Sequence, residues 1–360
     1  MLIPEPFRMK SAAAISGMTC LAVLLACPAG SAGLFAGGTP DRAPRKVILG
    51  TAMQAFWGDY PGLQRRLAQL ESILDTMNEQ SRKKFGRGLD LAVLPEVAVT
   101  GEITGDIVAH SVPYDGPVRA TFSRKARELG CYLVVPLYLL EDKERRICTN
   151  SAVLVDRKGD VVGIYRKLQL AVQSGSDSME GGMTPGKQAP VFDCDFGRLG
   201  IQICFDIEFD YGWEQLAKQG AELVAWPTQS PQTVHPASRA MRHGFYIVSG
   251  TWRDNASIFE PTGKIVSQIR APEQVVVDQI DLSYAILPWS PQLQQGAALR
   301  NKYGDRVGFH YYPDEDCGLF WSNDPGLTIG QMMRSIGVAG AEDELKRVRQ
   351  LYRKAGVPGY

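Results

Sequence analysis

Three short apolar runs in this chain each end abruptly at a polar residue of a reactive kind. Leu-Ala-Val-Leu-Pro precedes Glu96, Val-Gly-Ile-Tyr-Arg precedes Lys167, and Gly-Ile-Gln-Ile precedes Cys204. Apolar runs of this length, bounded by turn-forming or charged residues, indicate buried strands. Strand ends in an α/β fold open onto a common rim, where ligands usually bind. The chain therefore requires a fold with several buried strands, and we expect a carboxylate, an ammonium and a thiol at their ends.

Strand-like and helix-like segments alternate through most of the chain. Leucines recur at helical spacing over 63–84, which indicates an amphipathic helix. Turn residues at 157–160 and 261–264 separate short apolar runs, as in hairpins. This mixture predicts a mixed sheet, or two sheets with helices outside them. The expected helices cover 63–84, 118–129, 212–219 and 342–354. The expected strands cover 46–50, 89–94, 131–137, 151–155, 161–165, 190–193, 199–203, 223–226, 256–259 and 265–266.

The charge balance of the chain argues against a nucleic-acid partner. Its 360 residues contain 39 basic and 39 acidic side chains, so the formal net charge is zero. Nucleic-acid-binding proteins usually carry a basic excess that attracts phosphate. The length suits one large domain or two small ones, with an ample core.

The first 32 residues have the composition of an export signal. A basic start precedes an apolar stretch at 12–26, and small residues follow it. This pattern is typical of a secretory signal peptide, and the stretch is too short for a comfortable membrane span. Leu-Leu-Ala-Cys, ending at Cys27, also resembles a bacterial lipobox, so a lipid anchor at Cys27 and plain cleavage after Ala32 are both open. We expect 1–32 to direct export to the periplasm, the outside or a lipid-anchored position, and 33–45 to be a flexible linker.

Cysteine and histidine spacing gives no sign of a metal site. Two of the seven cysteines, Cys20 and Cys27, lie in the expected signal, and the remaining five cannot all pair within one chain. Neither CxxC nor HExxH occurs, and the four histidines form no close cluster in the sequence. We expect at least one free thiol and no metal, and the disulfide pairing stays open.

The three strand-end residues suit one another chemically. A carboxylate can take a thiol proton, and an ammonium can stabilise both the thiolate and the oxyanion that forms on attack. Taken singly, each has a plain structural explanation: Cys204 as a small buried side chain, Glu96 in a solvated turn, and Lys167 on a charged sheet edge. Their order and shared context favour a nucleophilic site.

The chain over 46–282 resembles the nitrilase superfamily of carbon–nitrogen hydrolases, which carries a Glu-Lys-Cys triad in this order. The local sequences LAVLPE, GIYRKLQL and GIQICFD are similar to those around the family's triad. Supporting matches are Asn-Ser-Ala-Val-Leu at 150–154, Thr-Pro-Gly at 184–186 and Pro-Thr-Gly at 261–263. The resemblance implies an α/β fold, a four-layer αββα sandwich of two sheets between helix layers, assembled as a homodimer or higher homo-oligomer.

By that resemblance Glu96 is the general base, Lys167 the oxyanion-stabilising cation and Cys204 the nucleophile. The family often carries a second glutamate shortly after the lysine, and Glu180 is the candidate here, to position substrate or water. A mobile loop acid is the plain alternative for Glu180. The backbone N–H of Phe205 is the candidate second donor to the oxyanion. This chemistry implies no metal and no cofactor.

The residues beside the nucleophile favour amide hydrolysis within the superfamily. Nitrile-hydrolysing members often have Trp-Glu after the cysteine, whereas Phe205 and Asp206 here resemble the amidase and carbamoylase pattern. We expect an amidase-type hydrolase that cleaves a non-peptide carbon–nitrogen bond of a small amide or carbamoyl compound through a thioester on Cys204. Nitrile hydrolysis, acyl transfer and a non-catalytic binding role are the alternatives. Asp206 is expected to be structural, because a carboxylate beside a thiol raises the pKa of that thiol.

One region departs from the family pattern, and another differs in character from the rest of the chain. Glu208 and the residues after it stand where many members have Arg-Phe-Pro-Glu, so a pocket-lining arginine is missing. Residues 288–324 are rich in aromatic residues, glycine and proline and show little periodicity. Because a segment with so little apolar periodicity would make a weak core alone, we expect 283–360 to be an extension packed on the hydrolase domain.

Overall fold

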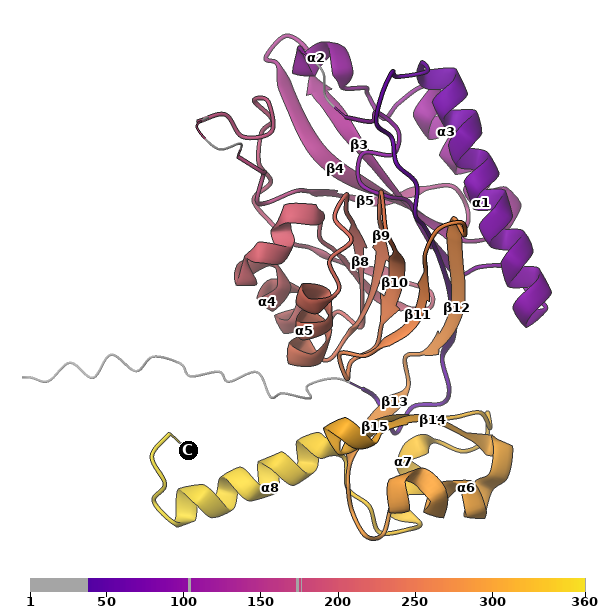
Figure 1. Ribbon diagram of the computed structural model, residues 1–360, viewed down its shortest axis with the longest axis vertical. Helices are drawn as coiled ribbons and strands as arrows, with labels where there is room; N and C mark the ends of the chain where they lie inside the picture. The colour runs from indigo at the N-terminus through magenta and orange to yellow at the C-terminus, as the bar shows by residue number, and fades with distance from the viewer. Residues whose placement is uncertain (1–37, 103–104, 173–174, 176, 360) are drawn as a thin grey trace, which may run out of the picture. The chain divides into compact units, whose positions relative to one another are not determined.

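The computed structural model describes residues 38–359, apart from 103–104, 173–174 and 176 (Figure 1). The chain divides into the units Met1–Ser31 and Ala32–Tyr360, and every described residue belongs to the second. The expected export signal, with the candidate anchor at Cys27, lies outside the described residues. In the described part of the chain, no helix is both long and apolar enough to cross a membrane.

Two six-stranded sheets form the centre of the fold. In spatial order, the first sheet contains β12 (Val275–Asp281), β1 (Lys46–Ala52), β2 (Leu91–Val93), β3 (Tyr132–Asp142), β4 (Ile147–Val155) and β5 (Val161–Arg166). The second contains β11 (Ile265–Ile269), β10 (Ala256–Phe259), β9 (Tyr246–Gly250), β8 (Leu223–Pro227), β7 (Gly197–Ile201) and β6 (Val191–Cys194). The central strands β1–β3 and β7–β9 run parallel, and their outer neighbours are antiparallel. Both sheets are therefore mixed.

Helices cover the outer faces of both sheets. They are α1 (Leu63–Phe85), α2 (Ile107–His110), α3 (Pro117–Leu129), α4 (Asp210–Lys218) and α5 (Val234–His243). Figure 1 shows α1 and α3 on one side of the paired sheets and α4 and α5 on the other. Apolar side chains of α1 and α3 share a buried cluster with the first sheet, and those of α4 and α5 share one with the space between the sheets. The predicted α/β sandwich is confirmed.

The side chains of β1 point alternately to the two faces of the first sheet, and both faces are buried. Val47 and Leu49 belong to the cluster shared with the second sheet, whereas Ile48, between them, belongs to the cluster under α1. Successive side chains of a strand point to opposite faces of its sheet. A nearly continuous apolar run therefore suits a strand that is buried on both sides.

Helix α1 shows how local sequence sets an element's end. The helix stops at Phe85, and Gly86 follows it with φ 73°, donating its N–H to the carbonyl of Arg82. A glycine reaches this left-handed conformation without the steric penalty that a side chain imposes, which makes it a common helix stop. Three basic side chains in the last turn also suit the negative end of the helix dipole.

Residues 283–360 form a third sheet with short helices around it. Its strands in spatial order are β13 (Tyr284–Pro288), β15 (Cys317–Ser322) and β14 (Val307–Tyr312), and its helices include α6 (Ala297–Tyr303), α7 (Ile329–Arg334) and α8 (Ala341–Lys354). A separate buried cluster, which includes Phe320 and Met332, fills this part. The stretch 288–324, which shows little periodicity in the sequence, thus contains two strands. The domain limits at 46–282 and 283–360 remain a prediction.

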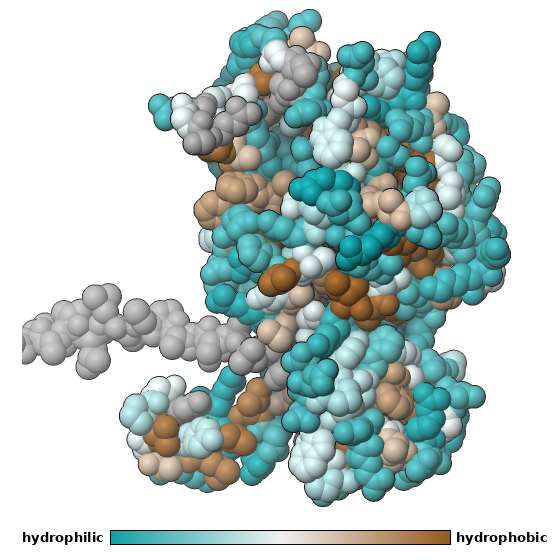
Figure 2. Space-filling model, in the orientation of Figure 1, coloured by the Kyte–Doolittle hydropathy of each residue, from teal (hydrophilic) through white to brown (hydrophobic). Residues whose placement is uncertain are grey.

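Tyr284 ties the third sheet to the sandwich. Its hydroxyl donates to the carbonyl of Gly244 at 2.7 Å, and its ring meets that of Tyr246 edge to face at 5.5 Å. Helix α8 is different, because Ala341 alone among its residues is buried. Figure 2 shows apolar surface along this helix. The third sheet is therefore fastened by specific contacts, while most of α8 lies at the surface.

Candidate active site

Strand ends bring the three predicted residues together. Glu96 follows β2, Lys167 follows β5, and Cys204 begins the short 3-10 helix η1 (Cys204–Glu208) after β7. Lys167 Nζ lies 2.9 Å from Glu96 Oε1. Both side chains are close enough to the thiol of Cys204 to shift its pKa, in opposite directions. Two strand ends of the first sheet therefore meet one strand end of the second.

Lys167 is a buried cation among acidic groups. Its side chain is 1% exposed and that of Glu96 is 2% exposed. Burial alone would lower the pKa of the Lys167 ammonium, but Glu96, Cys204 and Glu180 together outweigh burial and raise that pKa well above its ordinary value. An ammonium that is enclosed with carboxylates keeps its proton, because losing it would leave buried negative charge unpaired. Lys167 is therefore a fixed positive charge at neutral pH.

Glu180 is the second carboxylate on this ammonium. Lys167 Nζ donates to Glu180 Oε1, and the backbone N–H of Ala171 donates to the same oxygen at 3.2 Å. The other oxygen, Oε2, accepts from Asn150 Nδ2 at 3.0 Å. The structure therefore ties Glu180 to Lys167, which differs from the alternative of a mobile loop acid.

Asn150 is a site residue to which the sequence argument assigned no role. Its Nδ2 donates to Glu96 Oε1 at 2.9 Å as well as to Glu180. Glu96 Oε1 is thus bonded by both Asn150 and Lys167, whereas no described residue hydrogen-bonds the buried Oε2. Buried polar atoms without a partner are rare and often mark function. Glu96 Oε2 is therefore the oxygen available to accept a proton. Asn150 lies between Thr149 and Ser151 in β4, and these three buried polar side chains in a row are the signal that could have identified it.

Three non-glycine residues at the site have backbone dihedrals in the left-handed region. The φ angle is 48° at Val97, 41° at Cys204 and 40° at Glu180. A side chain at such an angle clashes with the backbone, at a cost of about 1–3 kcal/mol for each residue. Strain of this kind persists where the surrounding structure imposes it, and it gathers at functional sites. One of the three strained turns carries the cysteine itself.

The neighbours of the Cys204 thiol have opposing effects on its pKa. Burial and the carboxylate of Glu96 raise its pKa to about 12, although Lys167 lowers it. The hydroxyl of Thr228 and the backbone N–H of Gln229 also hydrogen-bond the sulfur and lower its pKa. At neutral pH the resting group is therefore a protonated thiol, and a base must remove its proton for attack. Thr228 and Gln229, in the loop after β8, are further site residues that the sequence argument missed.

Asp206 is a structural carboxylate, as the sequence argument expected. Its Oδ2 accepts from the Tyr165 hydroxyl at 2.6 Å and from the Ile203 N–H at 2.8 Å. Its Oδ1 accepts from the Gln169 N–H at 2.8 Å. Burial raises the pKa of Asp206 to about 6, although these hydrogen bonds oppose the rise. The bonds fasten the segment after β5 to the turn that carries Cys204.

Two buried tryptophans hold the backbone at the reacting residues. Trp252 Nε1 donates to the carbonyl oxygen of Glu96 at 2.9 Å, and Trp226 Nε1 donates to that of Cys204 at 3.2 Å. Phe205, whose backbone N–H is the candidate second oxyanion donor, follows Cys204 directly in η1. The amide of Phe205 therefore lies next to the nucleophile in a turn with a fixed backbone.

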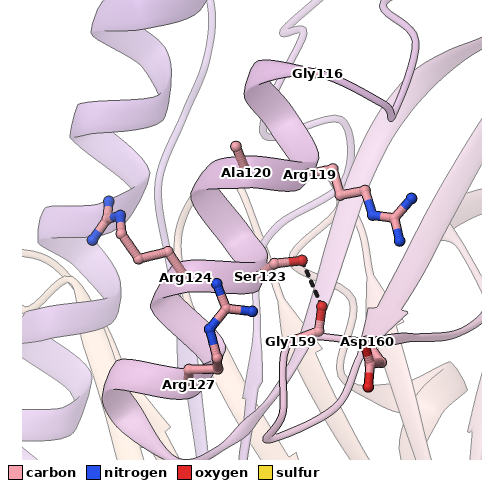
Figure 3. Close-up of a pocket in the computed structure, with 8 residues that line it drawn as sticks. All are labelled: Gly116, Arg119, Ala120, Ser123, Arg124, Arg127, Gly159 and Asp160. Carbon is pink, nitrogen blue, oxygen red and sulfur yellow. Dashed lines mark hydrogen bonds between the residues drawn. The ribbon is translucent and has the colours of Figure 1, made fainter.

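A surface hollow of about 570 Å³ lies over α3 and the turn between β4 and β5 (Figure 3). Figure 3 shows Arg119, Arg124 and Arg127 around it. Arg119 and Arg124 pair with Asp115 and Glu128, each at 3.1 Å, and Arg127 donates to a backbone carbonyl. No triad residue lines this hollow, so it is separate from the candidate active site. Across the described ranges, no group of three or more His, Cys, Asp or Glu side chains is arranged to hold a metal ion.

Known proteins resemble the chain in sequence and in fold. It is 27% identical over 224 residues to the omega-amidase NIT2 of Danio rerio, which covers 56% of this chain and 80% of that protein. Nit3 of Saccharomyces cerevisiae, a member of branch 10 of the nitrilase superfamily, superposes with a TM-score of 0.57 at 18% identity, over 72% of this chain and 95% of that one.

A bacterial amidase gives a second match of structure. The amidase of Nesterenkonia sp. AN1 superposes with a TM-score of 0.54 at 21% identity, over 64% of this chain and 92% of that one. That structure is a glutamate-to-glutamine mutant in which acrylamide has added to the active-site cysteine. At this identity the likeness shows a shared fold.

The family profile described as carbon-nitrogen hydrolase matches residues 58–287, which is more than half of the chain and includes Glu96, Lys167 and Cys204. With the sandwich fold and the similarity to an omega-amidase, this match decides the family. The chain belongs to the carbon–nitrogen hydrolases of the nitrilase superfamily.

Proposed function

We propose that this protein hydrolyses a non-peptide carbon–nitrogen bond in a small amide or carbamoyl compound, with Glu96, Lys167 and Cys204 as its triad. One observation carries the proposal. Glu96 has one oxygen bonded to Lys167 and Asn150, while its other buried oxygen has no partner among the described residues. This arrangement provides a base beside a thiol that is protonated at rest. The similarity to an omega-amidase supports an amide as substrate.

Acylation begins when Glu96 Oε2 removes the proton from Cys204 Sγ. The sulfur attacks the carbonyl carbon of the substrate, and the carbonyl oxygen takes the negative charge. Lys167 Nζ and the backbone N–H of Phe205 donate to this oxyanion. When the intermediate collapses, Glu96 returns the proton to the nitrogen, which leaves as ammonia or an amine. The acyl group stays on sulfur as a thioester.

Deacylation uses the same groups in the same places. A water molecule gives a proton to Glu96 as its oxygen attacks the thioester carbonyl, and the same two donors stabilise the second oxyanion. The carbon–sulfur bond then breaks, the acid leaves, and Glu96 returns the proton to Cys204 Sγ. One proton moves on and off Glu96 in each half-reaction, so the cycle regenerates the resting site.

Glu180 is assigned the task of positioning in this scheme. It accepts a hydrogen bond from Lys167 Nζ, and Asn150 Nδ2 links the two carboxylates. Because the lysine is held protonated, it can stabilise an oxyanion but cannot serve as the base. The division of labour between Glu96 and Lys167 therefore follows from their surroundings.

The test compares the full chain with its Cys204→Ala variant on a panel of amides, carbamoyl compounds and nitriles. Ammonia or amine release reports turnover, and intact mass reports an acyl adduct. We expect turnover that disappears in the variant, with the adduct mapped to Cys204. Cys131→Ala is the matched control, because Cys131 is also a buried thiol whose pKa is raised to about 12, yet it lies outside the site. That control should retain turnover.

Other results would select the alternatives. Turnover of nitriles alone would identify a nitrile hydrolase, and transfer of the acyl group to an added amine in preference to water would identify an acyltransferase. An intact protein with no turnover and a Cys204 that resists alkylation would identify a non-catalytic binding protein. Each of these results would overturn amide hydrolysis.

We also propose that 1–32 directs export and that the protein forms a homodimer or higher homo-oligomer. The first proposal rests on the composition of that segment, and the second on the family resemblance. The mass of the mature N-terminus distinguishes cleavage after Ala32 from a lipid on Cys27. A full-length cytoplasmic product would contradict export. A monomer by light scattering at micromolar concentration would contradict the second proposal.

A further inference from the structure

Three neighbouring strands of the first sheet place Tyr138, Asn150 and Lys167 side by side. Tyr138 on β3 pairs directly with Asn150 on β4. The carbonyl oxygen of Asn150 accepts the backbone N–H of Lys167 at 2.8 Å, where the pairing of β4 with β5 ends. Side chains that lie opposite each other on neighbouring strands point to the same face of the sheet, with Cβ atoms about 5 Å apart. The sheet therefore directs a phenol, an amide and an ammonium to one face.

This face is the one that points toward the second sheet. Val134, four residues before Tyr138, and Ala152, two residues after Asn150, belong to the buried cluster that the two sheets share. Side chains an even number of residues apart on a strand point to the same side. The phenol of Tyr138 therefore points toward the sheet that supplies Cys204.

The ring of Tyr138 is buried at this end of the sheet. The residue is 6% exposed, and it belongs to the buried cluster that also contains Leu170 and Met183. The segment between those two residues carries Glu180, which accepts a hydrogen bond from Lys167 Nζ. Because protein interiors are closely packed, a buried ring holds its hydroxyl in a defined position.

The hydroxyl of Tyr138 is within electrostatic range of the whole triad. Burial raises its pKa, and four charged or ionisable groups of the site shift that pKa further. Glu96, Glu180 and Cys204 raise it, and Lys167 lowers it. The phenol therefore stays protonated at neutral pH. A phenol that keeps its proton can donate a hydrogen bond to a negative charge that develops nearby.

No described residue uses this hydroxyl. The buried hydroxyls of Tyr165, Tyr246 and Tyr284 each donate to another residue, at 2.6 to 3.2 Å. The hydroxyl of Tyr138 makes no hydrogen bond with a described residue, and its oxygen is not among the fully enclosed polar atoms that lack one. It therefore borders open space beside the triad, where a substrate group can accept its hydrogen.

We propose that Tyr138 is a further catalytic residue, whose hydroxyl donates a hydrogen bond to the carbonyl oxygen of the substrate as Cys204 attacks. This role rests on the proposed function and adds a third donor to Lys167 and the backbone N–H of Phe205. Lys167 already donates to two carboxylates, whereas the hydroxyl of Tyr138 is uncommitted. Its bond strengthens as negative charge forms on the oxygen, so it stabilises the transition state more than the bound substrate.

Tyr138→Phe removes one oxygen and nothing else. Because that oxygen has no partner in the described chain, the free energy of unfolding in urea should change by less than about 1 kcal/mol. For an amide that the native chain hydrolyses, kcat should fall about a hundredfold with little change in KM, as expected for the loss of an oxyanion donor.

Tyr114→Phe is the matched control. Tyr114 is 8% exposed, and its buried hydroxyl also has no partner among the described residues. Burial, Arg119 and Asp115 shift the pKa of this hydroxyl, and no triad residue is among the causes. The control therefore removes an equivalent oxygen outside the site, and it should retain the native kcat.

A small aldehyde tests the same contact without turnover. Propanal has no leaving group, so it can only add to the thiol. The sulfur of Cys204 bonds to the carbonyl carbon, the carbon–oxygen double bond becomes single, and the thiol proton moves through Glu96 to the oxygen. The resulting hemithioacetal blocks alkylation of Cys204 by iodoacetamide, so protection gives the dissociation constant of propanal. Tyr138→Phe should raise this constant about tenfold, since one hydrogen bond is lost, and Tyr114→Phe should not change it.

Four results would overturn this role of Tyr138. They are native kcat and native propanal affinity in Tyr138→Phe, a rise in KM alone, equal losses in Tyr138→Phe and Tyr114→Phe, and a Tyr138→Phe chain that fails to fold. In each case the native chain still hydrolyses its amide, so the proposed function stands. A native chain with neither amide turnover nor protection of Cys204 by propanal would instead overturn the proposed function, and the role of Tyr138 with it.

Discussion

Two lysines in this chain are paired with buried carboxylates, and their pKa values move in opposite directions. Lys167, at the triad, is 1% exposed and its pKa is raised well above the ordinary value. Lys46, at the start of β1, lies 3.2 Å from Asp281 Oδ2 and has a side chain that is 27% exposed, and its pKa is lowered. Burial opposes the charge in both cases. The difference therefore comes from the groups around each ammonium.

The number of acidic partners explains the difference. Three acidic groups, Glu96, Glu180 and Cys204, surround the Lys167 ammonium, and together they outweigh its burial. Asp281 is the acidic group that supports the Lys46 ammonium, and it does not outweigh burial. A lysine therefore becomes a permanent buried cation where the fold places more than one carboxylate close to its ammonium group. At the triad this permanence suits an oxyanion donor, which must keep its proton.

Lys167→Met should have the largest effect of any change at these two sites. It leaves Glu96 and Glu180 close together in a buried place without their common cation, so one of them must take up a proton. Removing one partner of a buried ion pair typically costs about 3–5 kcal/mol in the free energy of unfolding. We expect a loss of that size in denaturant unfolding, together with loss of turnover. A variant as stable as the native chain would break the comparison.

Glu96→Gln should separate the reactivity of the thiol from turnover. The carboxylate of Glu96 raises the pKa of Cys204, so removing its charge lowers that pKa and increases the thiolate fraction. Iodoacetamide should therefore alkylate Cys204 faster in the variant at any pH below about 12. Turnover should fall by about a hundredfold to ten-thousandfold, because a general base is lost.

The rate of alkylation as a function of pH provides the control for that experiment. In the native chain the thiolate fraction increases about tenfold for each pH unit below the pKa. The profile of Glu96→Gln should have the same shape, moved to lower pH. A variant that is alkylated more slowly than the native chain would contradict the assigned effect of Glu96 on the thiol.

The central sandwich and the meeting of the triad could be predicted because both depend on local pattern. A buried strand has an apolar run as its sequence pattern, and a change to polar residues marks its end. Glu96, Lys167 and Cys204 each follow such a run. The predicted helix at 63–84 corresponds to α1, since its leucine spacing matches its buried face. The prediction for β3 ended too early, at 137, because its last residues pair with β4 while their burial decreases.

Features that depend on distant parts of the chain were missed. The role of Asn150 depends on two carboxylates that reach it from separate loops. The strained backbone at Val97 and Glu180 has no signal in the residue types, because neither is a common left-handed residue. The strands β14 and β15 pair with each other and with β13 over a stretch without regular alternation. The helix α5 was not predicted because it contains Pro236 near its start, and proline is disfavoured inside helices.

Asp206→Asn tests a buried carboxylate that has hydrogen-bond donors but no lysine. The pKa of Asp206 in the folded chain is about 6, above the ordinary value of about 3.9, so the folded chain binds this proton more tightly than the unfolded chain does. Its contribution to stability is therefore fully present below about pH 4 and is lost as the pH rises through 6. The loss amounts to about 3 kcal/mol for a shift of this size.

The variant cannot titrate at this position, so the comparison is made across pH. The stability advantage of the native chain over Asp206→Asn should shrink by about 2 kcal/mol between pH 4 and pH 7, measured by urea unfolding. Asp305→Asn, at a fully exposed carboxylate, should show no such change. Parallel curves for the native chain and Asp206→Asn would mean that the carboxylate is already ionised at pH 4.

Lys46→Met should have the smallest effect on stability. Asp281 keeps both backbone N–H donors on Oδ1 when the lysine is removed, so the free energy of unfolding should fall by only about 1 kcal/mol, as for a partly exposed ion pair. Urea unfolding of the variant and of the native chain measures this difference. A loss of stability as large as that in Lys167→Met would remove the contrast between the two lysines.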